Sequence, residues 1–396
     1  MALPLSDLRV VEMCQVYAGP YAAMILADMG ADVVKLEPPE GDSSRQDSSV
    51  SLGVDGMSFP FLTFNRNKRS IALNVHGPRG KEVAYKLFQW ADVFLIATRV
   101  ATRGRWGLTY EDASAINPKL IYASITGFGE NGPDADLPGI DLVNQARSGD
   151  AAFRGAPGGP PTSPTSLFHF DMATSMLTVA SVLGALRQRD QTGLGQKLEL
   201  SLLQSALSCH AVNMTRVKDS SAVNPTSRNP GVNRIYRCSD NRYIFASPIA
   251  SRWPEFCHAT GLERLLEDPL FNTPQKRQQN QQALSQVLSQ QFATRSAGEW
   301  EARLKAADQY VTVVQDMSTV HDDPQVIANQ MIVSFQQPGV GAVEAVNLPF
   351  KMSGMASDQW FRRPAPALGE HTGEVLHGLG YTSEGIDLLK ADGTVA

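Results

Sequence analysis

Short apolar runs alternate with helical stretches over residues 1–130 of the chain. The runs have the length and side chains of buried β-strands, and they cover residues 9–13, 32–37, 70–75, 92–97 and 120–126. Helical patterns separate them, and at 21–29 and 78–90 a proline lies near the first turn. Strands joined through helices lie parallel, so the pattern predicts an α/β fold with helices on both faces of a parallel sheet.

A second pattern follows the Gly- and Pro-rich loop 156–166. Residues 172–189 repeat apolar side chains on most sides of a helix, so we expect this helix to be buried. A strand pattern at 197–202 and another helix pattern at 203–217 come next.

The pattern of apolar and polar residues changes beyond the Ser-, Asn- and Pro-rich segment 218–233. Residues 235–247 have the pattern of a β-hairpin with a turn at Asp240 and Asn241, and polar helices follow. This part of the chain predicts a second, smaller α+β domain.

Composition narrows the class of protein. A length of 396 residues suggests two or three domains at roughly 150 residues each. Thirty-five Lys and Arg against 40 Asp and Glu give a net charge of −5, which excludes the broad basic surface of a nucleic-acid binder. The four cysteines lie far apart, so neither a disulfide framework nor a zinc site is expected. Without a signal-peptide pattern or an apolar run of about 20 residues, we expect a cytoplasmic enzyme that does not enter a membrane.

Several common kinds of site are excluded by their missing motifs. After the first strand, Tyr21 and Met24 stand where a dinucleotide fingerprint needs glycines beyond Gly19, so their side chains would block a pyrophosphate. The seven histidines form no H-E-x-x-H motif, and no metal site is predicted. The chain also has no G-x-S-x-G turn and no phosphate-binding loop.

Asp171 is the most informative single residue, because it stands directly before the buried helix. One interpretation makes it the N-cap, with its carboxylate accepting from an N–H near Thr174. The other makes it a nucleophile that the positive end of the helix keeps ionised, with nearby N–H groups for an oxyanion. The pattern of residues leaves both open.

Five segments in one order along the chain carry a resemblance to a known family: Val10–Asp42, Asn65–Val75, Asn117–Pro133, Phe170–Leu207 and Pro366–Tyr381. They resemble class III CoA-transferases, the formyl-CoA:oxalate and carnitine type, nearly from end to end. The resemblance implies that Asp171 attacks an acyl-CoA thioester to give a mixed anhydride and then an aspartyl-CoA thioester. It implies CoA thioesters and carboxylic acids as substrates, with no permanently bound cofactor and no metal. Asp141 matches an acidic position near the active site.

The resemblance also places residues against CoA. These are Leu73, Asn74, Val75, Ala97, Thr98, Arg99, Arg103 and Arg105. The three arginines suit phosphate groups, although a solvated basic loop is the alternative interpretation. Ala97 and Thr98 replace the asparagine and aromatic residue of the family pattern, so adenine stacking on this loop is not expected.

Other departures concern the acid that is exchanged. Gln15 and Tyr17 are expected to contact substrate, and Tyr17 stands where the formyl-CoA enzymes carry glutamine. No glycine run occurs near 246–253, so formyl-CoA:oxalate exchange is not expected. We hypothesise that His169 or Arg154 binds the second carboxylate of a dicarboxylic acid such as succinate. The alternative is a packed histidine and a surface arginine.

Two other functions compete with CoA transfer. The family also contains α-methylacyl-CoA racemases, whose Gly-His-Asp motif corresponds to Gly139, Ile140 and Asp141 here. Isoleucine cannot accept a proton, so His169 would have to supply the base. The third possibility is a non-catalytic CoA-binding or scaffold protein.

The resemblance finally implies a domain arrangement. A large Rossmann-like domain would comprise residues 1–217 and 349–396, and a small α+β domain would comprise 234–322. Residues 218–233 and 323–348 would connect them, and two chains would interlock as a homodimer.

Overall fold

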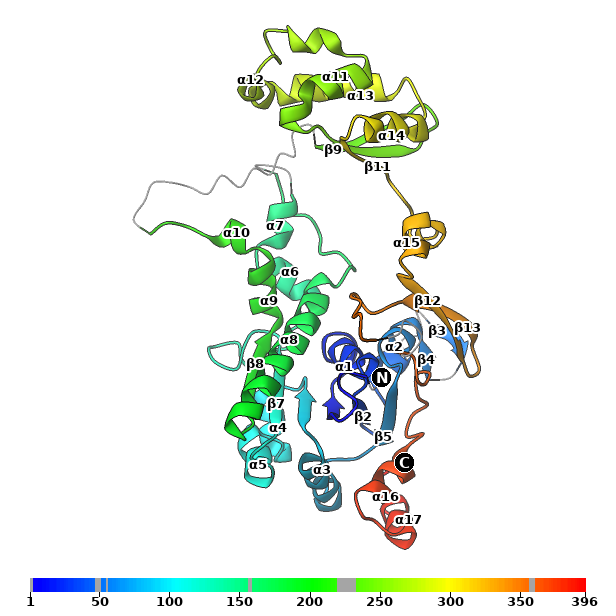
Figure 1. The fold of residues 1–396 in the computed structure, drawn as a ribbon. Helices are drawn as coiled ribbons and strands as arrows, with labels where there is room; N and C mark the ends of the chain where they lie inside the picture. Colours follow the sequence, from blue (N-terminus) through cyan, green and yellow to red (C-terminus); the bar gives the residue numbers. More distant parts are fainter. Residues whose placement is uncertain (1–2, 47–50, 55, 156–158, 219–232, 356–359) are drawn as a thin grey trace. The chain divides into compact units, whose positions relative to one another are not determined.

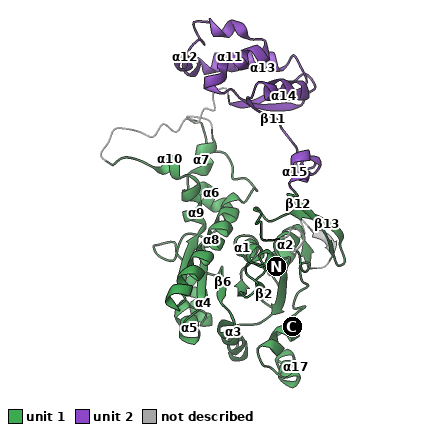
Figure 2. Ribbon diagram, in the orientation of Figure 1, with its two compact units in different colours: residues 1–224, 330–396 green, residues 225–329 purple. Residues whose placement is uncertain are grey.

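The computed structural model describes residues 3–46, 51–54, 56–155, 159–218, 233–355 and 360–396. The chain divides into two compact units (Figure 2). Unit 1 contains Met1–Asn224 and Gln330–Ala396, and unit 2 contains Pro225–Asn329. Most of the connection expected at 218–233 lies outside the described residues.

Unit 1 is built on a six-stranded sheet in the order β5-β2-β1-β6-β7-β8. Every neighbouring pair is parallel, as the alternating pattern predicted. Counted along the chain, this is the 3-2-1-4-5-6 order of the Rossmann fold. The strands are β1 (Arg9–Met13), β2 (Asp32–Glu37), β5 (Lys68–Ala72), β6 (Val93–Ile96), β7 (Ile121–Thr126) and β8 (Lys197–Ser201).

Helices cover both faces of this sheet, which confirms the predicted α/β fold (Figure 1). Adjacent strand residues point to opposite faces, so Val10 joins one apolar cluster and Val11 joins the other. On one face pack α1 (Ala18–Asp28) and α8 (His169–Thr192). On the other pack α3 (Pro78–Trp90), α5 (Tyr110–Ile116), α16 (Thr372–Gly378) and α17 (Ser383–Ala391).

The remaining elements of unit 1 are short. The helices are α2 (Phe59–Phe64), α4 (Val100–Trp106), α6 (Asp141–Arg147), α7 (Asp150–Arg154), α9 (Leu202–Cys209) and α10 (Ala211–Met214). The strands are β3 (Ser51–Val54) and β4 (Met57–Ser58), which pair, and the hairpin of β12 (Ile332–Gln337) and β13 (Gly341–Val346). Most of these short elements lie in segments whose sequence has no long apolar repeat.

The C-terminal residues return to the first edge of the sheet. Leu73 and Val395 form an antiparallel bridge just beyond β5, and the Asn74 N–H donates to the Thr394 carbonyl at 2.8 Å. Unit 1 is therefore closed by residues that follow unit 2 in the chain.

Two sequence interpretations differ from the structure, one in unit 1 and one in the segment that leads from unit 2 back to unit 1. The strand predicted at 70–75 begins earlier, because Lys68 is a fully buried member of β5 and a hydropathy pattern does not anticipate a buried lysine. The segment 323–348, interpreted as a connection, contains the helix α15 (Pro324–Ala328) and the hairpin β12–β13. Phe335 of that hairpin packs into the sheet's apolar cluster.

Unit 2 has a core of its own. Its three-stranded antiparallel sheet has the order β11-β10-β9, with β9 (Arg234–Arg237), β10 (Tyr243–Ser247) and β11 (Tyr310–Val313). The predicted hairpin is present, and Asn241 takes the left-handed conformation, φ 63°, at its turn. The sheet packs with α11 (Trp253–Thr260), α12 (Pro274–Gln279), α13 (Gln281–Phe292) and α14 (Ala297–Ala306).

Helix α8 is long and apolar enough to cross a membrane by length and composition alone, and it is the one such helix among the described residues. Its buried side chains include Asp171, Thr174, Ser175 and Thr178, which lie inside unit 1. We therefore interpret α8 as a helix with one face inside unit 1. The expected burial is only partial, because Met176 and Leu177 are exposed.

Candidate active site

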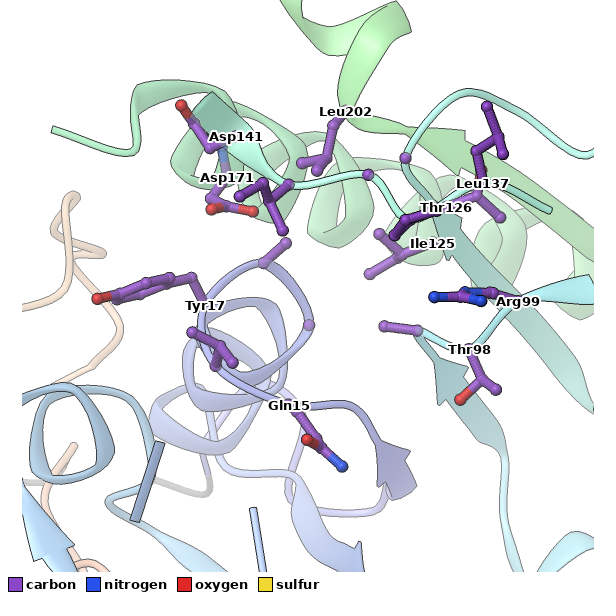
Figure 3. A pocket seen from close by; sticks show the side chains of 18 of the residues that line it. Gln15, Tyr17, Thr98, Arg99, Ile125, Thr126, Leu137, Asp141, Asp171 and Leu202 are labelled. Carbon is purple, nitrogen blue, oxygen red and sulfur yellow. Dashed lines mark hydrogen bonds between the residues drawn. The ribbon is translucent and has the colours of Figure 1, made fainter. Parts of the chain in front are cut away.

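The topology of the sheet creates a crevice between β1 and β6. These strands are neighbours, but the chain leaves them toward opposite sides of the sheet, so the residues after their carboxyl ends diverge. A cavity of about 440 Å³ opens there. It is lined by residues that follow β1, β6 and β7, by the loop before α6, and by the start of α8 (Figure 3).

Asp171 faces this cavity from the first turn of α8. Its side chain is largely buried, and among the described residues none donates a hydrogen bond to its carboxylate. Burial, with a further contribution from the negative charge of Asp141, raises the pKa of Asp171 to about 7. A carboxylate that is neither paired nor capped by hydrogen bonds retains its oxygen lone pairs for an incoming electrophile.

The N-cap interpretation of Asp171 is wrong, because the helix begins earlier than expected. Phe168 occupies the N-cap position in a left-handed conformation, φ 46°, and Asp171 lies inside the first turn. Asp141 supplies the cap from α6 instead: its Oδ2 accepts from the N–H of Phe170 at 2.7 Å and from that of Asp171 at 2.9 Å. The predicted supporting residue is therefore in direct contact with the backbone of Asp171.

Gln145, one turn after Asp141 on α6, holds that carboxylate in place. Its Nε2 donates to Asp141 Oδ1 at 2.6 Å and to the Thr165 carbonyl at 2.8 Å. Its Oε1 accepts from the Thr165 N–H at 2.8 Å and from Arg154 at 3.1 Å. Gln145 is fully buried, and it ties the capping carboxylate to the loop that leads into α8. The sequence analysis missed this residue; its i, i+4 spacing from Asp141 was the available signal.

A cluster of buried charged residues contacts the loop after β1. This loop contains Gln15 and Tyr17, which line the cavity. Lys35 Nζ lies 2.8 Å from Asp42 Oδ2 and donates to the Cys14 carbonyl at 3.0 Å. Asp42 Oδ1 accepts from the Val16 N–H at 3.3 Å. Val16 has φ 68°, an unusual conformation for a β-branched residue, which these buried contacts impose.

Glycine lets this loop turn tightly into α1. A Cβ on Gly19 would lie 2.3 Å from Cys14 Cβ, so only glycine fits there. From the other side, Ser175 Oγ donates to the Ala18 carbonyl at 2.7 Å and joins α8 to the start of α1. These contacts fix the loop after β1 relative to Asp171.

A second cavity, of about 650 Å³, adjoins the first. Leu73, Asn74 and Val75 line it, and Gln15, Ala97, Thr98 and Arg99 line both cavities. The structure thus brings together six of the eight residues expected at CoA, and it joins their cavity to the one that holds Asp171.

The other two arginines of that group do not line either cavity. Arg103 is buried in α4, where it pairs with Glu130 at 3.0 Å and donates to Ser124 Oγ at 2.6 Å. Arg105 is exposed and donates to Thr102 Oγ1 at 3.0 Å. The segment 99–105, interpreted as a basic loop, is mostly helix, so its arginines point in different directions.

Arg154 and His169 also lie outside the cavity lining. Arg154 Nε is 2.7 Å from Asp150 Oδ2, and the remainder of its guanidinium contacts Gln145 and the Ser163 carbonyl. The His169 ring packs edge-on against Phe170, and its Nε2 is 3.9 Å from Asp150. A contact of either side chain with the substrate therefore stays a prediction.

Among the described residues no group of His, Cys, Asp and Glu could hold a metal ion. The ionisable side chains that line the two cavities include Asp171, Asp141 and Arg99 in the first, and Glu40, His76 and Arg99 in the second.

The site therefore combines a Rossmann-type sheet with a carboxylate that faces the crevice, and the comparisons identify the class of protein. The chain belongs to CoA-transferase family III, whose family model matches residues 5–372. It is a CoA-transferase, which confirms the resemblance and excludes a non-catalytic scaffold.

Two curated relatives and one crystal structure illustrate the likeness. The chain is 32% identical over 419 residues to the formyl-CoA:oxalate CoA-transferase of Streptomyces avermitilis, with all of both chains covered. It is 28% identical to the succinyl-CoA:glutarate CoA-transferase of Mus musculus, covering 99% of this chain and 90% of that one. The crystal structure of a CAIB/BAIF family protein from Brucella suis matches with a TM-score of 0.82 and 28% identity, over 96% of this chain and 100% of that one.

Proposed function

We propose that this CoA-transferase moves CoA from an acyl-CoA donor to a free carboxylic acid through covalent chemistry at Asp171. The observation that carries the proposal is the position of Asp171: its unpaired carboxylate faces a cavity that continues into the one lined by Leu73, Asn74 and Val75. The substrates are CoA thioesters and carboxylic acids, and no permanently bound cofactor takes part.

The reaction divides into two symmetrical halves. An oxygen of Asp171 attacks the thioester carbonyl carbon, the C–S bond breaks, and a mixed anhydride and CoA thiolate form. The thiolate then attacks the Asp171 carbonyl carbon of the anhydride, which releases the first acid and leaves an aspartyl-CoA thioester. The acceptor carboxylate repeats these steps in reverse, so the acyl-CoA bond energy is retained and no net proton is exchanged.

The chain supplies donors for the negative charge that develops on the carbonyl oxygen. Ala18 and Gly19 stand at the start of α1 and line the cavity, and no side chain caps that helix end. Their N–H groups and the positive end of the helix favour an oxyanion. Arg99, at the junction of the two cavities, is placed for the phosphate groups of CoA.

A panel of CoA thioesters and free acids tests the transferase proposal. Each pair is incubated with the enzyme, and exchanged acyl-CoA is detected by mass spectrometry. Asp171→Asn keeps the size of the side chain but removes the nucleophile, so exchange should fall by at least about a thousandfold. Unchanged exchange by Asp171→Asn would refute the role of Asp171.

The covalent intermediates are tested separately. Incubation with acyl-CoA and hydroxylamine should convert Asp171 to its hydroxamate, and borohydride should reduce it, as read by peptide mass spectrometry. Labelling at other carboxylates with Asp171 left intact would exclude the aspartyl pathway.

The racemase alternative makes a different prediction. It requires a base beside the α-carbon, but Ile140 occupies the expected histidine position and His169 does not line the cavity. Uptake of deuterium from D₂O at C2 of a 2-methylacyl-CoA, without acid exchange, would favour racemisation over transfer.

We also propose that the enzyme acts as a cytoplasmic homodimer of interlocked chains. Helix α8 supports an interface, because Met176 and Leu177 remain exposed on it at 46% and 42%. Sedimentation equilibrium should give twice the mass of one chain, and a monomer at assay concentration would contradict the dimer. Fractionation of the native cells tests the location.

A further inference from the structure

We propose that the acyl group accepted beside Asp171 is uncharged and apolar, so that the acids exchanged are apolar monocarboxylic acids and not dicarboxylic acids. This inference rests on the proposed transferase function. It concerns the acyl chamber, which we define as the part of the first cavity lined by Tyr17, Ile125, Ile140, Phe168 and Leu202.

The walls of the acyl chamber are apolar. Tyr17 and Phe168 stack with ring centroids 4.5 Å apart, and Tyr17 also meets the edge of the Phe64 ring. Ile140 is 58% exposed although it lines the cavity, so its side chain is in water when no substrate is present. Covering such surface with the hydrocarbon part of an acyl group is favourable, because it removes apolar surface from water.

The charges in the chamber oppose a second carboxylate. Asp141 and Asp171 both line this end of the cavity, and Arg99 is the one cation among the described residues that line it. Figure 3 shows Arg99 with Thr98 on the opposite side of the cavity from the two aspartates. Arg99 also lines the second cavity, so it lies where the two cavities join.

A dicarboxylate whose far carboxylate lies at the aspartate end, away from Arg99, would therefore bury that charge without a cationic partner among the described lining residues. An unpaired charge in a partly desolvated site is strongly unfavourable, and the negative charge of Asp141 adds repulsion. Arg154 does not relieve this, because its guanidinium is already held by Asp150 and Gln145. The geometry thus points away from succinate, which the sequence had suggested.

Isotope self-exchange tests the inference on one acid at a time. Each acyl-CoA is incubated with its own ¹³C-labelled acid, and label entering the thioester is followed by mass spectrometry. The acids are succinate, its monomethyl ester, and 4-methylpentanoate, in which an isopropyl group replaces the second carboxylate. We expect the two singly charged acids to exchange at least about tenfold faster than succinate at equal concentration.

The outcomes separate this inference from the proposed function. Succinate exchange as fast as that of 4-methylpentanoate overturns the inference and leaves the transferase function standing. No label transfer with any acid, together with no hydroxamate at Asp171, overturns the transferase function and the inference with it.

A charge-introducing variant tests the cause. Ile140→Arg places a guanidinium in the chamber at an exposed position, and it should raise the ratio of succinate to 4-methylpentanoate exchange about tenfold. An effect of the substitution on Asp171 itself would change the exchange of both acids equally, so it cancels in the ratio of succinate to 4-methylpentanoate exchange. Leu194→Arg is the control, since Leu194 is 59% exposed and lies outside the cavity lining. If Ile140→Arg has a wild-type circular dichroism spectrum and an unchanged ratio, charge does not select the acid and the inference is overturned.

Discussion

The proposed role of Asp171 as nucleophile predicts a pH dependence, because a carboxyl group must lose its proton before it can attack. Below about pH 7 most of the Asp171 carboxyl groups are protonated, and above it they are ionised. We expect kcat/KM to rise with pH and to reach half its plateau near pH 7. A profile measured between about pH 5 and pH 9 checks this, and a flat profile across neutrality would contradict it.

The variant Asp141→Asn separates the two causes of the raised pKa of Asp171, which are burial and the charge of Asp141. The variant removes the neighbouring charge but keeps an oxygen that can accept from the N–H of Phe170 or Asp171. Burial remains, so the pKa of Asp171 should fall only part of the way toward its ordinary value, and the acidic limb of kcat/KM should move to lower pH. Carbodiimide labelling of Asp171 against pH, read by peptide mass spectrometry, gives the same shift without substrate. A limb that stays in place would show that Asp141 acts only as a cap.

Gln145 is a positioning residue in this network. Gln145→Leu keeps the volume but leaves Asp141 Oδ1 and both backbone groups of Thr165 without partners. We expect kcat to fall about tenfold while KM for acyl-CoA changes little, since the second cavity is not touched. Asn144→Leu, a buried amide lost from the same helix, is the control and should lower stability without this loss in kcat. Equal kcat losses in both variants would indicate a general effect of destabilisation.

At the scale of single residues, the sequence predicted the reactive group but not the groups that orient it. Asp171 stood out because it opens an apolar helix after a Gly- and Pro-rich loop. Lys35, Asp42 and Gln145 look in sequence like ordinary polar positions, and only the fold shows that each is buried with a specific partner. A charged residue in a strand pattern gives no sign of which distant group will pair with it.

Elements were predicted well where an apolar repeat is sustained. The strands β1 and β2 and the helix α3 have the bounds expected from sequence. Helix α4 was missed, because its seven residues include two arginines and a glycine and show no sustained apolar repeat. Because α4 was missed, the sequence analysis grouped the three arginines as one phosphate site. In the structure Arg99 lines the cavities and Arg103 is buried inside unit 1.

A matched pair of variants on this element distinguishes the two arginines. Arg99→Gln should raise KM for acyl-CoA about tenfold with no loss of stability, because it removes a charge from the CoA side of the site. Arg103→Gln should lower the free energy of unfolding by about 3 kcal/mol, since it breaks a buried pair with Glu130. Steady-state kinetics and urea unfolding measure the two effects, and a reversal of the pattern would refute the assignment.

At the scale of the whole molecule, unit 2 carries its own apolar core, which includes Phe256, Leu284, Phe292 and Trp300. We expect a fragment of residues 233–329 to fold alone and to unfold cooperatively on heating, because a domain with its own core is an independent folding unit. Circular dichroism of the purified fragment tests this, and a spectrum without helical structure would show that unit 2 depends on unit 1.

The sequence pattern predicted where unit 2 begins, because the pattern of residues changes there. It did not predict that residues after unit 2 return to unit 1 and complete it. The sequence of residues 394–396 does not predict their pairing with residues 72–74, because a single bridge produces no periodic pattern of apolar residues. Contacts between segments that far apart depend on the complete fold.

That closing contact has a consequence for biosynthesis. Leu73 and Asn74 leave the ribosome early, but their partners Thr394 and Val395 are made only after all of unit 2. The backbone contacts that Leu73 and Asn74 make with Val395 and Thr394 therefore cannot form until unit 2 has been synthesised, although Leu73 and Asn74 line the second cavity.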